Sequence, residues 1–136
     1  MYQILLIVGA SVLGVLGVVH IVYTFLTDKF SVYDLSVLSS MKSTSPKITK
    51  ETTVWDAWVG FNVSHSLGLI LFAFMYIPLA LNHVDFIKAS VWFSSIPVVF
   101  SVGYLFLAYR YWFRVPLIGV SMSLICFIGA QSTLYI

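Results

Sequence analysis

Residues 55–68 read W-D-A-W-V-G-F-N-V-S-H-S-L-G and lead from a charged, tryptophan-rich boundary into a long apolar segment. On the way into that segment the stretch carries Asn62, Ser64, His65 and Ser66. Polar side chains at that depth in hydrocarbon are costly unless they have partners. The stretch therefore predicts the start of a membrane-spanning helix and, within it, a polar site.

The composition of the chain is that of a membrane protein. Hydrophobic residues make up 60% of its 136 residues and charged residues 9%, whereas soluble domains carry about 25% charged residues. The net charge of +2 gives no indication of a nucleic-acid partner, and the basic residues are better interpreted as topology signals. The length predicts one integral membrane domain over residues 1–136.

Four apolar segments are long enough to cross a hydrocarbon core of about 30 Å as helices. The first lacks the positive start of a signal peptide and is too long for its apolar part, so we expect a retained span. Thr53 and Asp56 have the spacing of a capping box, which starts the second span near Val54. The two short connections force antiparallel neighbours, so the fold class is all-α membrane, an antiparallel four-helix transmembrane bundle. The predicted spans cover about residues 4–26, 54–81, 87–109 and 115–135.

Small residues mark places where helices are expected to meet. Ala10 and Gly14 lie four positions apart in the first span, a spacing that lets a second helix approach closely. The third span is expected to use small residues in the same way: Ser94, Ser95, Ser101 and Gly103.

Residues 27–53 form the long connection and hold most of the charged side chains, so they are expected outside the hydrocarbon. Ser45-Pro46 would end any helix in this connection. The alternative to a helix in this connection is an irregular loop. We predict a short amphipathic helix on the membrane surface, because apolar residues recur every three positions: Val32, Leu35, Leu38 and Met41.

Lysine and arginine are distributed unequally between the two sides of the predicted bundle. Six of the seven lie in connections 27–53 and 110–114, and only Lys88 lies in the connection between the second and third spans. Positive residues accumulate on the cytoplasmic side of membrane proteins. Both connections are therefore predicted to be cytoplasmic, in a multi-pass protein of the bacterial inner (cytoplasmic) membrane with both termini on the periplasmic side.

The two intramembrane histidines are predicted at the same depth. His20 lies six residues from the end of the first span, and His65 lies seven residues past Trp58. At about 1.5 Å per residue, both are about 10 Å below the inner surface. Asn62, three residues before His65, shares its helix face. We expect His20, His65 and Asn62 to meet inside the bundle.

The chemistry of this cluster leaves three interpretations open. As cofactor-binding residues, His20, His65 and Asn62 would use the paired histidines to hold haem b, or imidazoles to bind copper or zinc. No metal-ligating set is predicted, because a metal needs three or four ligands and no Cys, Asp or Glu is expected at that depth. As a structural network, the same residues would lock helices together by hydrogen bonds. A proton relay is the third interpretation, although no ionisable group continues the path outward.

Two segments resemble a known group of proteins. The run T-T-V-W-D-A-W-V-G-F-N-V-S-H-S-L-G at 52–68, preceded by G-V-V-H-I-V-Y-T-F at 17–25, resembles an uncharacterised family of small four-helix bacterial inner-membrane proteins. A looser similarity is to DoxX-like membrane proteins. The resemblance covers the first two spans and their connection. It implies the four-helix fold and the importance of Asn62 and His65, and it brings no catalytic residue with it.

The sequence favours a structural or binding role over catalysis. No serine has a histidine and an acid at a recognisable spacing, and no phosphate-binding loop is present. We expect an accessory or structural subunit of a larger membrane complex, with membrane lipids and other membrane-protein subunits as partners. The alternatives are a haem- or quinone-binding electron-transfer protein that uses His20 and His65, and a small enzyme or transporter for a lipid-soluble substrate.

Overall fold

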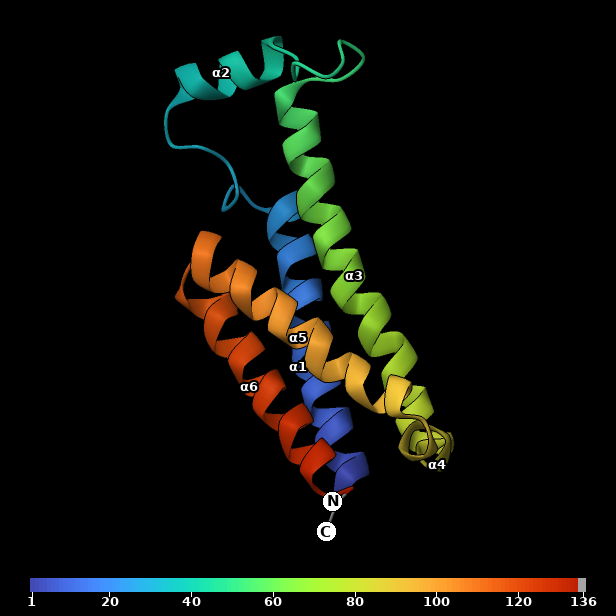
Figure 1. Cartoon of the computed structure of the whole chain (residues 1–136). Helices are drawn as coiled ribbons and strands as arrows, with labels where there is room; N and C mark the ends of the chain where they lie inside the picture. Colours follow the sequence, from blue (N-terminus) through green and yellow to red (C-terminus); the bar gives the residue numbers. More distant parts are fainter. Residues whose placement is uncertain (135–136) are drawn as a thin grey trace. The chain divides into compact units, whose positions relative to one another are not determined.

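The computed structural model describes residues 1–134 of the chain, and its regular structure is helical (Figure 1). Two short helices are α2 (Leu35–Ser43) and α4 (Val84–Ala89). Among the described residues, four helices are long and apolar enough to cross a membrane: α1 (Tyr2–Leu26), α3 (Val54–Asn82), α5 (Val91–Tyr111) and α6 (Arg114–Ser132). The described chain is thus an all-α, multi-pass membrane protein, as its composition predicted.

The start of α3 follows the predicted cap. The Thr53 hydroxyl accepts a hydrogen bond from the Asp56 N–H at 3.1 Å and donates one to the Asp56 carboxylate at 2.8 Å. The first N–H groups of a helix have no partner within the helix, so such a cap fixes where the helix begins.

The third predicted span differs from the structure. Residues 84–89 form the separate helix α4, and α5 begins at Val91 instead of residue 87. Ser90 caps α5 by accepting a hydrogen bond from the N–H of Phe93 at 3.4 Å. This local cap interrupts the predicted third span, and a hydropathy profile does not detect a cap. The predicted end of the fourth span at residue 135 lies outside the described residues.

The chain divides into two compact units. The large unit consists of Met1–Leu16 with Leu69–Ile136, and the small unit consists of Gly17–Gly68. Helices α1 and α3 each contribute one part to each unit.

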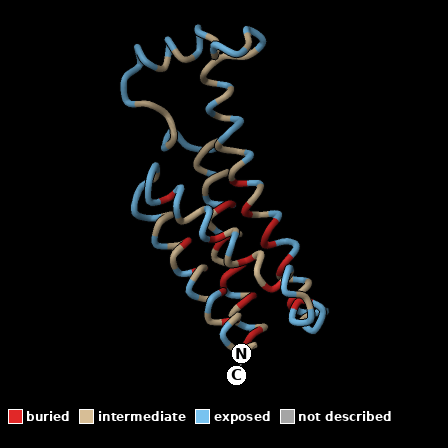
Figure 2. The backbone as a smooth tube through the Cα atoms, in the orientation of Figure 1, coloured by how far each residue is buried: buried red, intermediate tan, exposed pale blue. Residues whose placement is uncertain are grey.

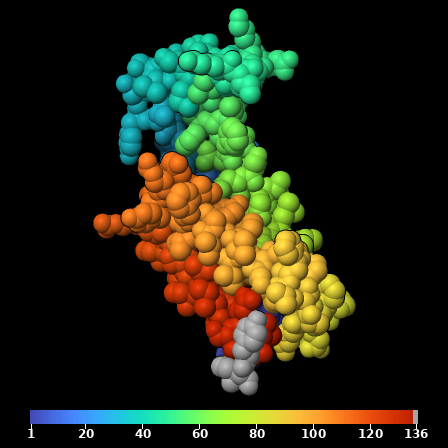
Figure 3. Space-filling model, viewed as in Figure 1, coloured from blue at the N-terminus to red at the C-terminus, as the bar shows by residue number. Residues whose placement is uncertain are grey.

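Aromatic side chains fill the centre of the large unit. The ring of Phe72 stacks on Phe100 at 4.4 Å and on Tyr76 at 4.6 Å, and meets the edge of Phe127 at 5.9 Å between centroids. Buried residues, drawn in red in Figure 2, concentrate in this unit. Helices α5 and α6 lie side by side in it, as Figures 1 and 3 both show. The four rings thus form part of the hydrophobic core of the large unit.

Small residues on α1 allow close helix contact in the large unit. A Cβ atom at Gly14 would lie 2.8 Å from the Cβ of Ala73 on α3, and Ala10 is completely buried. The predicted role of Ala10 and Gly14 is therefore confirmed. The prediction for Gly103 is wrong, because a Cβ there would meet no atom of the described residues within 4 Å. Spacing alone does not tell which glycine faces a neighbour.

Helix α2 confirms the predicted short helix in the connection 27–53 and belongs to the small unit. Its N-cap is Asp34, whose carboxylate accepts hydrogen bonds from the N–H and the hydroxyl of Ser36 at 2.8 and 2.7 Å. The helix ends at Ser43, and the carbonyl of its C-cap residue, Thr44, accepts a hydrogen bond from the N–H of Val54 at 2.9 Å. This bond ties the end of α2 to the start of α3 (Figure 1).

Candidate functional site

A hydrogen bond between His20 and Asn62 joins α1 to α3 inside the small unit. Nε2 of His20 lies 2.9 Å from Oδ1 of Asn62. The Asn62 amide nitrogen donates to the carbonyl of Trp58 at 2.8 Å, so Oδ1 is the acceptor and His20 Nε2 is the donor. The structure thus brings together His20 and Asn62, two of the three predicted site residues.

His65 is the third predicted residue, and it lies beside His20. The centroids of the two imidazole rings are 5.5 Å apart, and the ring planes are inclined by 58°. The neighbouring Ser66 is fully buried, and its hydroxyl donates to the carbonyl of Asn62 at 2.8 Å. The structure therefore brings all three predicted residues together, and the adjacent Ser66 bonds to the backbone of Asn62.

Two aromatic residues lie next to the cluster. The ring of Phe30, from the turn after α1, lies 4.2 Å from the ring of His20 between centroids. Trp58 holds this turn in place, since its indole N–H donates to the carbonyl of Phe30 at 3.2 Å. Trp58 also accepts, through its own carbonyl, the hydrogen bond from the Asn62 amide. The small unit therefore surrounds His20 with an amide, an aromatic ring and a second imidazole.

The donor set of this cluster is two imidazoles and one amide. Among the described residues, no group of three or more His, Cys, Asp or Glu side chains is placed to hold a metal ion. Two imidazoles alone provide fewer ligands than the three or four that zinc sites use. The cluster is therefore better suited to hydrogen bonding than to metal chelation.

A haem between the two histidines would compete with the hydrogen bond that His20 makes to Asn62. A ligating imidazole nitrogen lies about 2 Å from its metal, and a bis-histidine haem would need both nitrogens aimed at one iron through the macrocycle. Here the ring centroids are 5.5 Å apart, and Nε2 of His20 is engaged by Asn62. Ligation of an iron through this nitrogen would require the hydrogen bond to break.

Sequence reasoning did not identify Phe30 and Trp58 as part of the cluster. For Trp58 a signal existed: it lies four residues before Asn62, the spacing at which an Asn side chain reaches a backbone carbonyl in a helix. For Phe30 there was none, because its position depends on the turn that follows α1, where the N–H of Ser31 bonds to the carbonyl of Asp28 at 2.8 Å.

Comparisons of the chain with protein-family models, with characterised proteins and with solved structures find no match.

Proposed function

We propose that this protein is an accessory or structural subunit of a larger complex in the bacterial inner membrane. In this proposal the His20–Asn62 hydrogen bond fastens α1 to α3, and the outer helix faces contact lipids and partner subunits. The resemblance of residues 17–25 and 52–68 to small inner-membrane proteins is part of the proposal, as is the cytoplasmic placement of connections 27–53 and 110–114. The six basic residues of those connections support this orientation.

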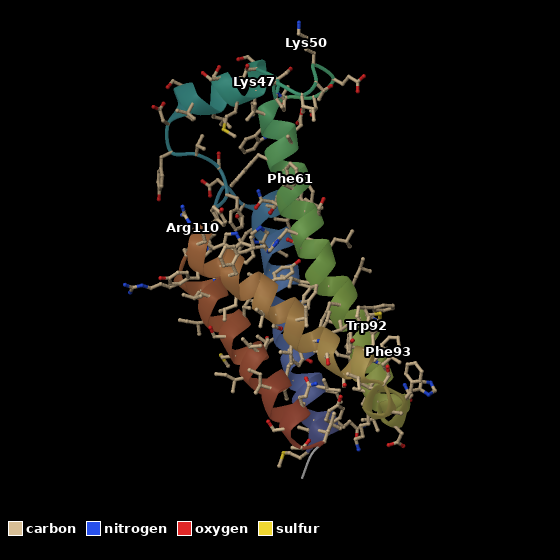
Figure 4. The ribbon with its side chains drawn as sticks, viewed as in Figure 1. Lys47, Lys50, Phe61, Trp92, Phe93 and Arg110 are labelled. Carbon is tan, nitrogen blue, oxygen red and sulfur yellow. The ribbon has the colours of Figure 1, made fainter. Side chains whose placement is uncertain are left out.

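The observation that carries the proposal is the exposure of the four spans. Within the most apolar window of each span, only 22 to 33% of the residues are buried inside the chain. Large side chains such as Phe61 and Phe74 are 77% and 76% exposed, and Figure 4 shows Phe61 extending from α3. A chain with this much unburied helix surface has room for neighbouring helices as well as lipid.

The polar cluster supports a structural role for the site. Its hydrogen bonds are made within the small unit, from His20 to Asn62 and from Asn62 to Trp58. Hydrogen bonds between membrane helices contribute about 0.6 kcal/mol on average and up to about 1.7 kcal/mol. That is enough to fix how two helices pair, and no reaction has to be assumed to explain the side chains.

The test is purification of the full chain from its native membrane in a mild detergent. We expect the chain to elute with at least one other membrane protein in a constant ratio through two successive columns, with the mass of the particle measured by light scattering. Elution of the chain alone, with the mass of one copy plus detergent, would contradict the proposal.

A variant of the site separates a structural role from a ligand-binding role. His65→Gln keeps a donor and an acceptor, so we expect the expression level and the co-eluting partner to be retained. An absorbance spectrum of the same samples provides the contrast. A visible absorption band that disappears in His65→Gln while the particle stays intact would favour the cofactor interpretation over the structural one.

A further inference from the structure

A pocket of about 450 Å³ lies in the small unit and shares Phe30 and Trp58 with the cluster around His20 and Asn62. It is lined by the last turn of α1, the turn that follows it, one side of α2 and the first turns of α3. Its walls combine aromatic rings, aliphatic side chains and one residue of each charge. The residues that decide its chemistry are Asp28, Phe30, Leu38, Lys42, Trp55 and Trp58.

The walls of this pocket are held by bonds within the small unit. Trp58 donates to the carbonyl of Phe30 at 3.2 Å, which fixes the turn against α3. The bond from the N–H of Val54 to the carbonyl of Thr44 at 2.9 Å fixes the end of α2. These two bonds hold the walls of the pocket, and a site whose walls are held in place loses less free energy to ordering on binding.

The charges of the pocket are one cation and one anion. The ammonium group of Lys42 lies 5.5 Å from the centre of the Trp55 ring, and Asp28 lines the same pocket. Lysine is a common phosphate-binding residue, whereas a carboxylate and the faces of tryptophan rings attract ammonium groups. The pocket therefore matches a ligand that carries a phosphate and an ammonium group and has no net charge.

The position of the pocket points to a lipid. Tryptophans concentrate at the level of the headgroups in membrane proteins, and Trp55 and Trp58 lie at the start of the span α3. Phe25 and Leu26, at the end of α1, also line the pocket and are 60% and 78% exposed. They extend an apolar surface from the pocket along the span, where acyl chains would lie.

We propose that this pocket binds phosphatidylethanolamine. The phosphate would interact with Lys42, the primary ammonium group with Asp28, and the acyl chains with the end of α1. Phosphatidylglycerol fits less well, because its net negative charge would face Asp28 with no ammonium group to compensate. Phosphatidylcholine fits less well because its quaternary ammonium group donates no hydrogen bond to the carboxylate.

The experiment uses the full chain in detergent with equal amounts of three lipids that have the same acyl chains: phosphatidylethanolamine, phosphatidylglycerol and phosphatidylcholine. Native mass spectrometry measures which lipid stays bound. We expect phosphatidylethanolamine to be retained about tenfold over the other two, a difference of about 1.4 kcal/mol. Equal retention of all three lipids would overturn the proposal.

Two lysine variants test the site against general charge effects. Lys42→Gln should reduce the retention of phosphatidylethanolamine about tenfold, whereas Lys50→Gln should leave it unchanged. Lys50 carries the same charge on the same connection, but it extends from the loop after α2 (Figure 4) and does not line the pocket. An equal loss in both variants would overturn the proposal.

Asp28→Asn should change which lipid is preferred, and it serves if Lys42→Gln fails to fold, which circular dichroism would reveal. Removal of the carboxylate should shift the preference from phosphatidylethanolamine towards phosphatidylglycerol. An unchanged preference would overturn the proposal. Glycerophosphoethanolamine, which has the headgroup without acyl chains, should not displace the lipid at the same concentration; complete displacement would exclude a lipid ligand. None of these outcomes bears on co-elution with a partner protein, which tests the accessory-subunit proposal.

Discussion

Different interactions stabilise the interior of each of the two units of this protein. In the large unit, stacked rings such as Phe72 and Phe100 and the close approach of Gly14 to Ala73 provide the contacts between helices. In the small unit, directional hydrogen bonds provide the contacts: His20 of α1 donates to Asn62 of α3, and Trp58 of α3 donates to Phe30 in the turn after α1. Lipid removes the hydrophobic driving force between helices and leaves packing and hydrogen bonding. The comparison teaches that the large unit should be sensitive to side-chain volume and the small unit to hydrogen-bonding capacity.

The largest expected effect is that of added volume in the large unit. Gly14→Ala places a methyl group 2.8 Å from the Cβ of Ala73, and overpacking of this kind costs about 1–3 kcal/mol. Gly103→Ala is the matched control, since its methyl group meets no described atom within 4 Å; it should be neutral or slightly stabilising. The free energy of unfolding is measured by titration with a denaturing detergent. An equal loss of unfolding free energy in both variants would show that the close contact at Gly14 does not cause the effect.

The next effect concerns the hydrogen bonds of the small unit. Asn62→Leu removes the acceptor of His20 and should lower the free energy of unfolding by about 0.5–2 kcal/mol. Asn82→Leu in the large unit is the control, because the Asn82 amide bonds within its own helix, to the carbonyl of Pro78 at 3.1 Å. Its change should stay within about 0.5 kcal/mol. The same detergent titration measures both, and a larger loss for Asn82→Leu would show that the helix-to-helix bond is not what matters.

A smaller effect is expected at the cap of α3. Thr53→Ala removes the acceptor of the Asp56 N–H and should cost about 1 kcal/mol, whereas Thr53→Ser keeps the hydroxyl and should cost little. Amide hydrogen exchange at residues 54–57 measures the fraying of this turn. If Thr53→Ser frays as much as Thr53→Ala, the hydroxyl is not the cap.

The smallest effect is a pH dependence at the start of α2. Hydrogen bonds from the side chain and the backbone N–H of Ser36 hold the pKa of the Asp34 carboxyl below its usual range. A carboxyl with a lowered pKa in the folded state stabilises the helix start above its unfolded pKa, and this contribution is lost as the pH falls through the folded pKa.

Amide exchange at Ser36 should therefore accelerate in acid beyond the intrinsic rate. In Asp34→Asn, which still accepts hydrogen bonds but does not titrate, this extra acceleration should be absent. An identical pH profile in both proteins would show that Asp34 does not control the helix start.

Particular residues show how far the sequence predicts this protein. Thr53 and Asp56 located the start of α3 to the residue, because a cap depends on side chains three positions apart. The start of α5 was missed by several residues, because the cap at Ser90 interrupts an otherwise apolar run. Equal depth predicted that His20 and His65 would approach each other, and they do. Phe30 escaped prediction because its place beside His20 depends on a turn with no periodic pattern.

The sequence by itself determined that the chain has four membrane-spanning helices, a short helix in its long connection and a polar site on two of the spans. Each of these features follows from the length and the hydropathy pattern of one continuous segment of the chain. Only the tertiary structure decided which glycine meets a neighbour, which atom of Asn62 accepts from His20, and that Lys42, Asp28 and two tryptophans line one pocket. The physical reason is that each depends on the rotation of one helix against another and on the path of a turn, which are set by contacts between residues distant in the chain.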